Sequence, residues 1–221
     1  MGRGRYISEN DVYIDLLHEK PNRILDFGCG KGELIDELLK LNCKWIQGLE
    51  VSSEFRRENV LIVEDSIAYL ESNPEKYDLI IARESLYYIP KSEQVRLWTA
   101  LHNSLVQGGT LAIIVLNGAL QTSQWVIQKD HGIQFIFNEV LLKHFAQIVG
   151  LQNQRIFAIR STHHTLIGKI GFTMLSTVRS LITQFTFISE RGIDRNNPTI
   201  FSKSLLFLGS RNINKEANLE F

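Results

Sequence analysis

Short apolar runs alternate along the chain with segments in which apolar residues recur every three or four positions. The first pattern predicts buried strands and the second predicts amphipathic helices. Strands are expected at residues 23–27, 45–49, 60–63, 77–82, 110–116, 154–159 and 204–209. Helices are expected at residues 9–19, 33–41, 92–106 and 138–149. Such alternation is typical of an α/β fold, in which helices cover both faces of a mostly parallel sheet.

Local signals mark several of the expected boundaries. The Gly108–Gly109 pair is expected to stop the third helix, whereas Asn138 and Gly150 are expected to cap the two ends of the fourth. The polar residues 52–59 leave room for about one helical turn. Residues 160–203 form a connection far longer than the roughly six residues usual in compact domains, so we interpret them as an insertion before the last strand. Its helically spaced apolar residues predict a helix that covers a pocket, forms a homodimer contact or packs in the core.

The composition indicates one domain, residues 1–221, that acts on a small partner. With 44% hydrophobic and 22% charged residues, the chain can bury one sizeable core. Lys plus Arg equals Asp plus Glu at 24 each, so no net positive charge favours nucleic acid or an anionic membrane. Cys29 and Cys43 indicate no disulfide framework, the amino terminus lacks a secretory signal, and charges interrupt the apolar window 167–189. We therefore expect a cytoplasmic protein without an integral membrane span.

The strongest chemical signal is a glycine-rich turn between the first long strand and the helix that follows it. Gly28, Gly30 and Gly32 alternate with other residues in the run Asp26-Phe-Gly-Cys-Gly-Lys-Gly32. Glycine allows a sharp turn and a close approach to a ligand, and a helix amino terminus offers free N–H groups. A ligand with a carboxylate or phosphate fits such a turn. The spacing differs from G-x-G-x-x-G and so disfavours a dinucleotide.

The segment Ile24-Leu-Asp-Phe-Gly-Cys-Gly-Lys-Gly-Glu-Leu34 resembles the first motif of class I S-adenosylmethionine (SAM)-dependent methyltransferases. The resemblance covers about residues 20–116 and implies SAM as the cofactor. It also implies a Rossmann-like sheet of seven strands whose last strand is antiparallel. Glu50 would accept hydrogen bonds from the ribose hydroxyls, and Asp65 would contact the adenine amino group unless it only caps a helix. The implied cofactor-binding residues are Asp26, Gly28, Cys29, Gly30, Gly32, Glu50, Val51, Asp65, Ser66 and Arg83.

The fourth expected strand and the loop after it bear on the methyl acceptor. Methyltransferases of DNA amino groups and of protein glutamine carry Asn or Asp followed by Pro-Pro and an aromatic residue there. This chain has Ala82-Arg-Glu-Ser85 instead, which disfavours those substrates. Arg83, Glu84, Tyr87 and Tyr88 are candidates to line the mouth of the active site, and the alternative is that Leu86 and one tyrosine pack the following helix.

A general base would assist a hydroxyl acceptor, because an alcohol has a high pKa and histidine titrates near neutral pH. His131 precedes Phe135 and a Leu-rich helix, a pattern that resembles methyltransferases of sugars and natural products. We therefore predict His131 as the base, unless it only caps or packs the loop, with His163 and His164 as weaker alternatives. No metal is expected, because Asn117 lacks the clustered Asp and Asn partners of metal-dependent relatives.

The favoured activity is methyl transfer from SAM to a small molecule, such as a hydroxyl of a sugar, a surface-glycan precursor or a natural product. One alternative is an N- or C-methyltransferase of a small metabolite, for which His131 would be dispensable. Another is a SAM-binding regulatory module without catalysis. An NAD-binding oxidoreductase is disfavoured by the spacing of the glycines.

Overall fold

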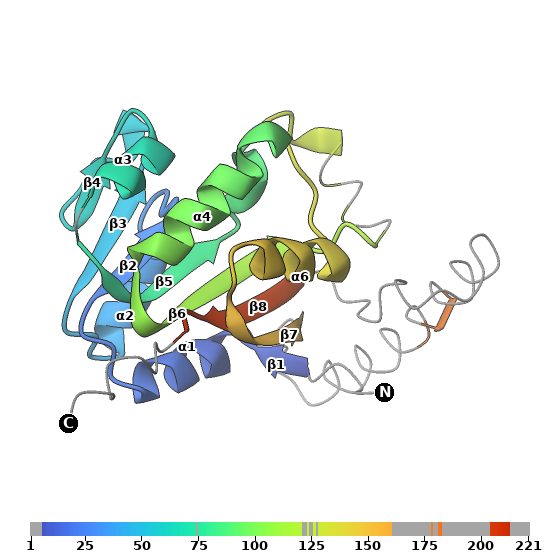
Figure 1. Ribbon diagram of the computed structural model, residues 1–221, viewed down its shortest axis with the longest axis horizontal. Helices are drawn as coiled ribbons and strands as arrows, with labels where there is room; N and C mark the ends of the chain where they lie inside the picture. The colour runs from blue at the N-terminus through green and yellow to red at the C-terminus, as the bar shows by residue number, and fades with distance from the viewer. Residues whose placement is uncertain are drawn as a thin grey trace, which may run out of the picture.

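The computed structural model describes residues 6–73, 75–120, 123, 126, 128–160, 178, 181–182 and 204–212 (Figure 1). The strands are β1 (Tyr6–Ser8), β2 (Ile24–Phe27), β3 (Ile46–Glu50), β4 (Val60–Ile62), β5 (Tyr77–Arg83), β6 (Leu105–Leu116), β7 (Gln152–Arg160) and β8 (Ser204–Ser210). The α-helices are α1 (Glu9–His18), α2 (Glu33–Lys40), α3 (Ser66–Ser72), α4 (Gln94–Ser104) and α6 (Glu139–Ile148). Short 3-10 turns are η1 (Ser53–Phe55), η2 (Leu86–Tyr88) and η3 (Lys91–Glu93).

All strands join one mixed sheet in the order β1-β7-β8-β6-β5-β2-β3-β4. Strand β8 runs antiparallel to β6 and β7, whereas the other neighbouring pairs are parallel. The predicted Rossmann-like class I fold is confirmed, and β2 to β8 are the seven expected strands. The three-residue strand β1 adds an eighth by pairing with β7. The order places β2 inside the sheet, between β5 and β3, so the turn after it lies at the carboxyl edge with strands on both sides.

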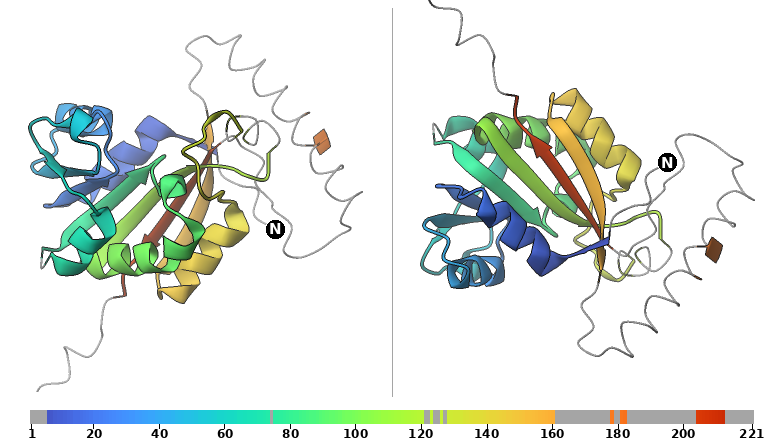
Figure 2. Two further views of the ribbon diagram at one scale, coloured as in Figure 1. Left: turned by 90° about the horizontal axis from the view of Figure 1, so that it is seen from above. Right: turned by 90° about the horizontal axis from the view of Figure 1, so that it is seen from below.

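Helices cover both faces of the sheet, as the alternating pattern predicts (Figure 2). One core cluster joins α3, α4 and α6 to side chains such as Leu25 and Phe27 of β2. The other joins α1 and α2 to Ile24 of the same strand and to residues on neighbouring strands. Successive side chains of a strand point to opposite faces, which is why one short strand contributes to both clusters. Asp26 points to the same face of the sheet as Ile24, because the two residues are two positions apart in the strand.

Besides β1, two features differ from the sequence-based prediction. Helix α4 ends at Ser104, two residues before the predicted end, and the Gly108–Gly109 pair lies inside β6 instead of stopping a helix. Leu105 already pairs with Tyr77, and the register then shifts, so the two glycines occupy an irregular stretch of the ladder. Helix α3 was not predicted. Its seven residues bury only Ser66, Ile67 and Leu70, too few to show a helical period in the sequence.

The turn at η1 agrees with the expected single turn between β3 and β4. Most of the expected insertion, residues 161–203, lies outside the described residues. Within it, Val178, Leu181 and Ile182 are described, and these three are helical and exposed. Among the described residues, no helix has the length and apolarity needed to cross a bilayer.

Candidate cofactor site

The turn after β2 adopts a backbone that favours glycine at three positions. Gly28, Gly30 and Gly32 have φ values of 69°, 51° and 78°, which L-residues with a side chain rarely adopt. The Gly28 and Cys29 N–H groups donate to the Leu49 carbonyl at 2.8 and 3.2 Å, so the turn folds back over the end of β3. The glycine spacing in the sequence is therefore required by this backbone.

The first two glycines of the turn serve different purposes. A methyl group at Gly28 would collide with Cβ of Ser85, whose hydroxyl donates to the Phe27 carbonyl at 2.7 Å. Gly28 thus allows the loop after β5 to pack against the turn. A methyl group at Gly30 would meet no atom within 4 Å. Gly30 therefore borders open space, where a ligand can approach the backbone.

Glu50, at the end of β3, holds this turn by hydrogen bonds from backbone N–H groups to its carboxylate. Its carboxylate is almost buried, with 9% exposure. Oε2 accepts from the Gly30 N–H at 2.8 Å, and Oε1 accepts from the Val51 and Ser52 N–H groups at 2.8 and 3.0 Å. A carboxylate oxygen accepts about two hydrogen bonds, so Oε2 retains capacity for one further donor.

Asp26, the last polar residue of β2, is a buried carboxylate with an unsatisfied oxygen. It is 2% exposed, and its Oδ2 has no hydrogen-bond partner. Burial raises the pKa of Asp26 to about 7; the nearby Arg83 cation opposes this shift and Glu50 adds to it. An unpaired buried oxygen costs free energy that a donor can relieve. Asp26 is thus suited to an ammonium or other donor entering from the cleft beside it.

A cleft of about 380 Å³ opens beside Asp26 at the carboxyl ends of the parallel strands. Its lining combines the turn with the ends of four further strands or their loops: Asp26, Gly28, Cys29, Gly30, Lys31, Glu33, Arg83, Glu84, Ile114, Ile159 and Ser204. Arg83 lies 3.9 Å from a carboxylate oxygen of Glu33 and 3.7 Å from one of Glu37. The cleft therefore presents both signs of charge, which suits a zwitterionic ligand.

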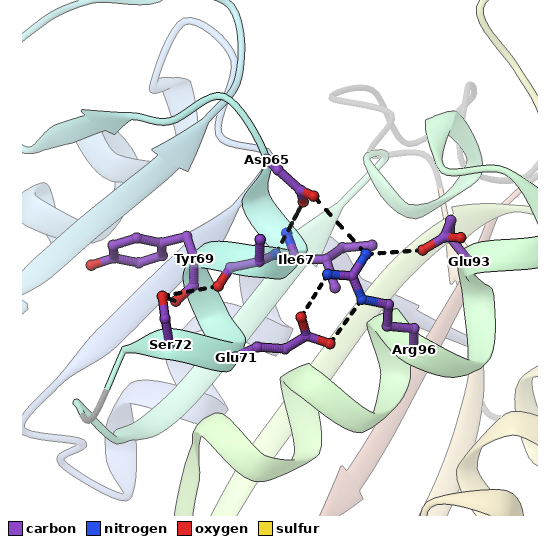
Figure 3. A network of polar contacts seen from close by, with 8 residues as sticks. Asp65, Ile67, Tyr69, Glu71, Ser72, Glu93 and Arg96 are labelled. Carbon is purple, nitrogen blue, oxygen red and sulfur yellow. Dashed lines mark hydrogen bonds and ion pairs between the residues drawn. The ribbon is translucent and has the colours of Figure 1, made fainter.

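Asp65 has the role of a helix cap. Its Oδ1 accepts from the Ile67 and Ala68 N–H groups at 2.8 and 3.0 Å, so the helix-cap interpretation is confirmed (Figure 3). Its Oδ2 lies 4.0 Å from Arg96, which also makes a two-point contact with Glu71 at 2.6 and 2.8 Å. Contact of Asp65 with adenine stays a prediction. The adjacent Ser66 is buried.

Two other predicted contacts differ in exposure. Val51 leaves 55% of its surface exposed beside Glu50, as an apolar contact for an adenine ring would require. Cys29 is half-buried, and a methyl group at Gly48 would lie only 2.5 Å from its sulfur. Burial raises the pKa of the Cys29 thiol to about 12. Cys29 is therefore a packing residue of the turn and is poorly suited to act as a nucleophile.

On the acceptor side, the loop after β5 is joined to the loop before α6. The Tyr88 hydroxyl donates to Asp130 at 2.9 Å, and the other oxygen of Asp130 accepts from the Gly132 N–H at 2.9 Å. Tyr87 is buried, as the packing interpretation predicts, whereas Tyr88 is 44% exposed. His131 is exposed on the turn between Asp130 and Gly132 and does not line the cleft. Its role as a base stays a prediction.

The remaining candidates for the acceptor site or for a metal are Glu84, Asn117, His163 and His164. Glu84 lines the cleft with a φ of 53°, a strained conformation for a residue with a side chain. Asn117 is buried, and its side chain accepts from the Ala119 N–H at 3.1 Å. His163 and His164 lie outside the described residues. Among the described residues, no group of three His, Cys, Asp or Glu side chains could hold a metal ion.

Sequence reasoning missed three residues that support the site. Ser85 and Arg57 contact the glycine turn, and the fully buried Gln94 donates to the Leu86 and Ile89 carbonyls at 3.0 and 2.8 Å. Gln94 thereby shapes the loop that carries both tyrosines. A lone Ser, Arg or Gln carries no local signal, because its partners lie elsewhere in the sequence.

Comparison with known families identifies the chain. The family model described as "Methyltransferase domain" matches residues 5–166. The chain belongs to this family. Together with the class I fold and the glycine motif, this membership makes the protein a SAM-dependent methyltransferase. A search of curated proteins found no match.

Solved structures share the fold at low sequence identity. A SAM-dependent methyltransferase from Archaeoglobus fulgidus is 16% identical with a TM-score of 0.63, over 92% of this chain and 95% of the other. An O-methyltransferase family protein from Burkholderia thailandensis is 13% identical with a TM-score of 0.60, over 93% of this chain and 56% of the other. The N-methyltransferase NodS from Bradyrhizobium japonicum is 14% identical with a TM-score of 0.52, over 92% and 94%. These structures support the fold and leave the acceptor open.

Proposed function

We propose that this methyltransferase transfers a methyl group from SAM to a small molecule whose reacting atom is a hydroxyl of a sugar, a surface-glycan precursor or a natural product. The observation that carries the SAM part of the proposal is the buried Asp26 Oδ2, which has no partner and lies beside the open space at Gly30. A cofactor that carries an ammonium group and packs closely against the backbone at Gly30 fits both features. The hydroxyl acceptor rests on the resemblance of the segment around His131 to methyltransferases of sugars and natural products.

The residues of the cleft suggest how SAM would be held. Asp26 would accept from the ammonium of the methionine portion, and Arg83 or the first N–H groups of α2 would meet its carboxylate. Glu50 Oε2 would accept from a ribose hydroxyl, and Val51 would pack against adenine. Asp65 Oδ2 and the backbone beside Ser66 are the proposed contacts for the adenine edge.

Bound SAM would supply a methyl group already activated by its sulfonium. The task left to the protein is to align the acceptor atom with that methyl group and to exclude water. Glu84 and Arg83 border the cleft where an acceptor would enter. His131 would remove the hydroxyl proton if acceptor binding brings the exposed loop at residues 130–132 toward the cleft.

A second candidate is an amine acceptor, and the position of His131 favours it. His131 is exposed and does not line the cleft, and an uncharged amine needs no base to remove a proton before attack.

Two measurements test the proposal in sequence. Calorimetry with SAM and S-adenosylhomocysteine tests cofactor binding, and failure to bind either compound would remove the cofactor assignment. Release of S-adenosylhomocysteine is then measured over two acceptor panels, one of hydroxylated sugars and natural products and one of small amines. Turnover confined to the amine panel would replace the hydroxyl assignment with the second candidate.

A further inference from the structure

The last residue of β3 and the connection from β3 to β4 both hold the glycine turn. Glu50, at the end of β3, accepts from the Gly30 N–H at 2.8 Å. In the connection, Nη1 of Arg57 donates to the Lys31 carbonyl at 3.0 Å and, more weakly, to the Gly32 carbonyl at 3.5 Å. Arg57 is therefore the counterpart of Glu50, and it contacts carbonyl groups where Glu50 contacts an N–H group.

The guanidinium of Arg57 is itself held in place. Its Nη2 and Nη1 donate to the two carboxylate oxygens of Asp36 at 2.6 and 3.0 Å. The hydrogen bond to Arg57 holds the pKa of Asp36 below its usual range. A two-point contact of this kind fixes the plane of the guanidinium. A methyl group at Gly32 would lie 2.9 Å from Nη1, so glycine at this position lets the guanidinium approach the turn without shifting.

The planar peptide group converts these contacts into an orientation of N–H groups. In a trans peptide, the C=O of one residue points opposite to the N–H of the next, and the described chain has no cis peptide bond. Arg57 holds the Lys31 carbonyl on its own side, so the N–H group of Gly32 points away from it. The Gly32 carbonyl, 3.5 Å from Nη1, also accepts from the Asp36 N–H at 3.1 Å, so the first turn of α2 helps to direct the Glu33 N–H. The Gly32 N–H donates to the Cys29 carbonyl at 2.9 Å. The Glu33 N–H is the first of α2, which has no side-chain cap, and Glu33 lines the cleft.

We propose that Arg57 is a positioning residue for the amino-acid portion of SAM. It acts through the turn and does not itself line the cleft. Three of the five residues from Gly28 to Gly32 are glycine, and glycine has the largest backbone freedom to lose on ordering. By fixing the outer carbonyls, Arg57 orders the turn before the ligand arrives, which favours binding. The inference rests on the proposed function, because it assumes that the turn holds SAM.

Binding of two ligands by Arg57 variants tests this role. S-adenosylhomocysteine carries the amino-acid portion, whereas 5′-methylthioadenosine lacks it. Arg57→Gln is expected to raise the Kd of S-adenosylhomocysteine about three- to tenfold, the range for a partly exposed charged hydrogen bond. The Kd of 5′-methylthioadenosine is expected to change less than about twofold. Arg57→Lys keeps one charged donor and should restore part of the affinity. Asp36→Asn should resemble Arg57→Gln in direction, because it frees the guanidinium.

A matched control separates positioning from general stability. Arg23→Gln breaks the 2.6 Å ion pair with Glu75 at the opposite, amino edge of the sheet. It should shift the Tm without changing either Kd.

Each outcome of this experiment decides one point. Equal weakening of both ligands by Arg57→Gln, or an unchanged Kd for S-adenosylhomocysteine, would overturn the positioning role while cofactor binding by the wild type stands. Absence of binding by the wild type would instead overturn the proposed function. If Arg57→Gln does not fold, Arg57→Lys and Asp36→Asn decide by the same criteria.

Discussion

Replacing Asp26 with Asn is expected to change how the stability of the cofactor-free protein depends on pH. Asp26 is 2% exposed, its Oδ2 has no hydrogen-bond partner, and burial raises its pKa to about 7. In the unfolded chain the same carboxyl titrates near its ordinary pKa of 3.8. Between these values the folded protein binds the proton and the unfolded chain does not. The free energy of unfolding contributed by Asp26 therefore falls as the pH rises from about 4 to about 7.

The size of this effect follows from the two pKa values. At about 1.4 kcal/mol for each pH unit, the interval between 3.8 and about 7 corresponds to about 4 kcal/mol, which we take as an upper bound. Asn has nearly the same shape and does not ionise. The Asp26→Asn variant should therefore gain stability relative to the wild type as the pH rises, and the gain should level off above pH 7.

Urea unfolding of both proteins between pH 4.5 and 8.5, without cofactor, measures this difference. Asp36→Asn is a control whose stability difference from the wild type should not change with pH in this window, because the hydrogen bond to Arg57 lowers the pKa of Asp36 from 3.8. Its stabilising contribution is fully present above the ordinary pKa and is lost only as the pH falls below it, so between pH 4.5 and 8.5 the control should be less stable than the wild type by a constant amount. Parallel curves for Asp26→Asn and the wild type, within about 0.5 kcal/mol, would mean that Asp26 titrates normally and that our account of its burial is wrong.

Three further predictions concern the turn, the ribose contact and the base. Gly30→Ala should fold with a small loss of Tm from its φ of 51°, since a methyl group there meets no atom within 4 Å, and should weaken SAM binding; Gly28→Ala should lower the Tm more, because it adds a collision with Ser85 to the strain of its positive φ. Calorimetry and thermal unfolding check these two variants. Unchanged SAM affinity in Gly30→Ala would contradict our inference that SAM approaches the backbone at Gly30. Glu50→Gln should weaken SAM binding by about 1 to 3 kcal/mol, because it loses charged hydrogen bonds to the turn and the ribose, and an unaltered Kd would contradict this. His131→Ala should lower turnover without changing the Kd of SAM, whereas full activity would end its assignment as base.

Local sequence was sufficient where the physical cause is local. The strand at Ile24–Phe27, the alternating glycines and the cap at Asn138 each follow from residues close in sequence, and the structure confirms the strand, the positive φ angles and the cap. The Gly108–Gly109 pair was misinterpreted as a helix stop, because its true place depends on a contact between residues that are far apart in the sequence. Pairing of Leu105 with Tyr77 begins β6 earlier, and this pairing joins residues 28 positions apart.

The sequence by itself therefore determined the fold class and the type of ligand site, because periodicity and glycine spacing express backbone preferences. Only the tertiary structure decided that the Asp26 oxygen is buried without a partner and that Arg57 meets the turn through the Lys31 carbonyl. It also left His131 exposed on a loop held by Tyr88 and Asp130. Burial and contacts between distant residues depend on how the strands are ordered in the sheet, and no local pattern encodes that order.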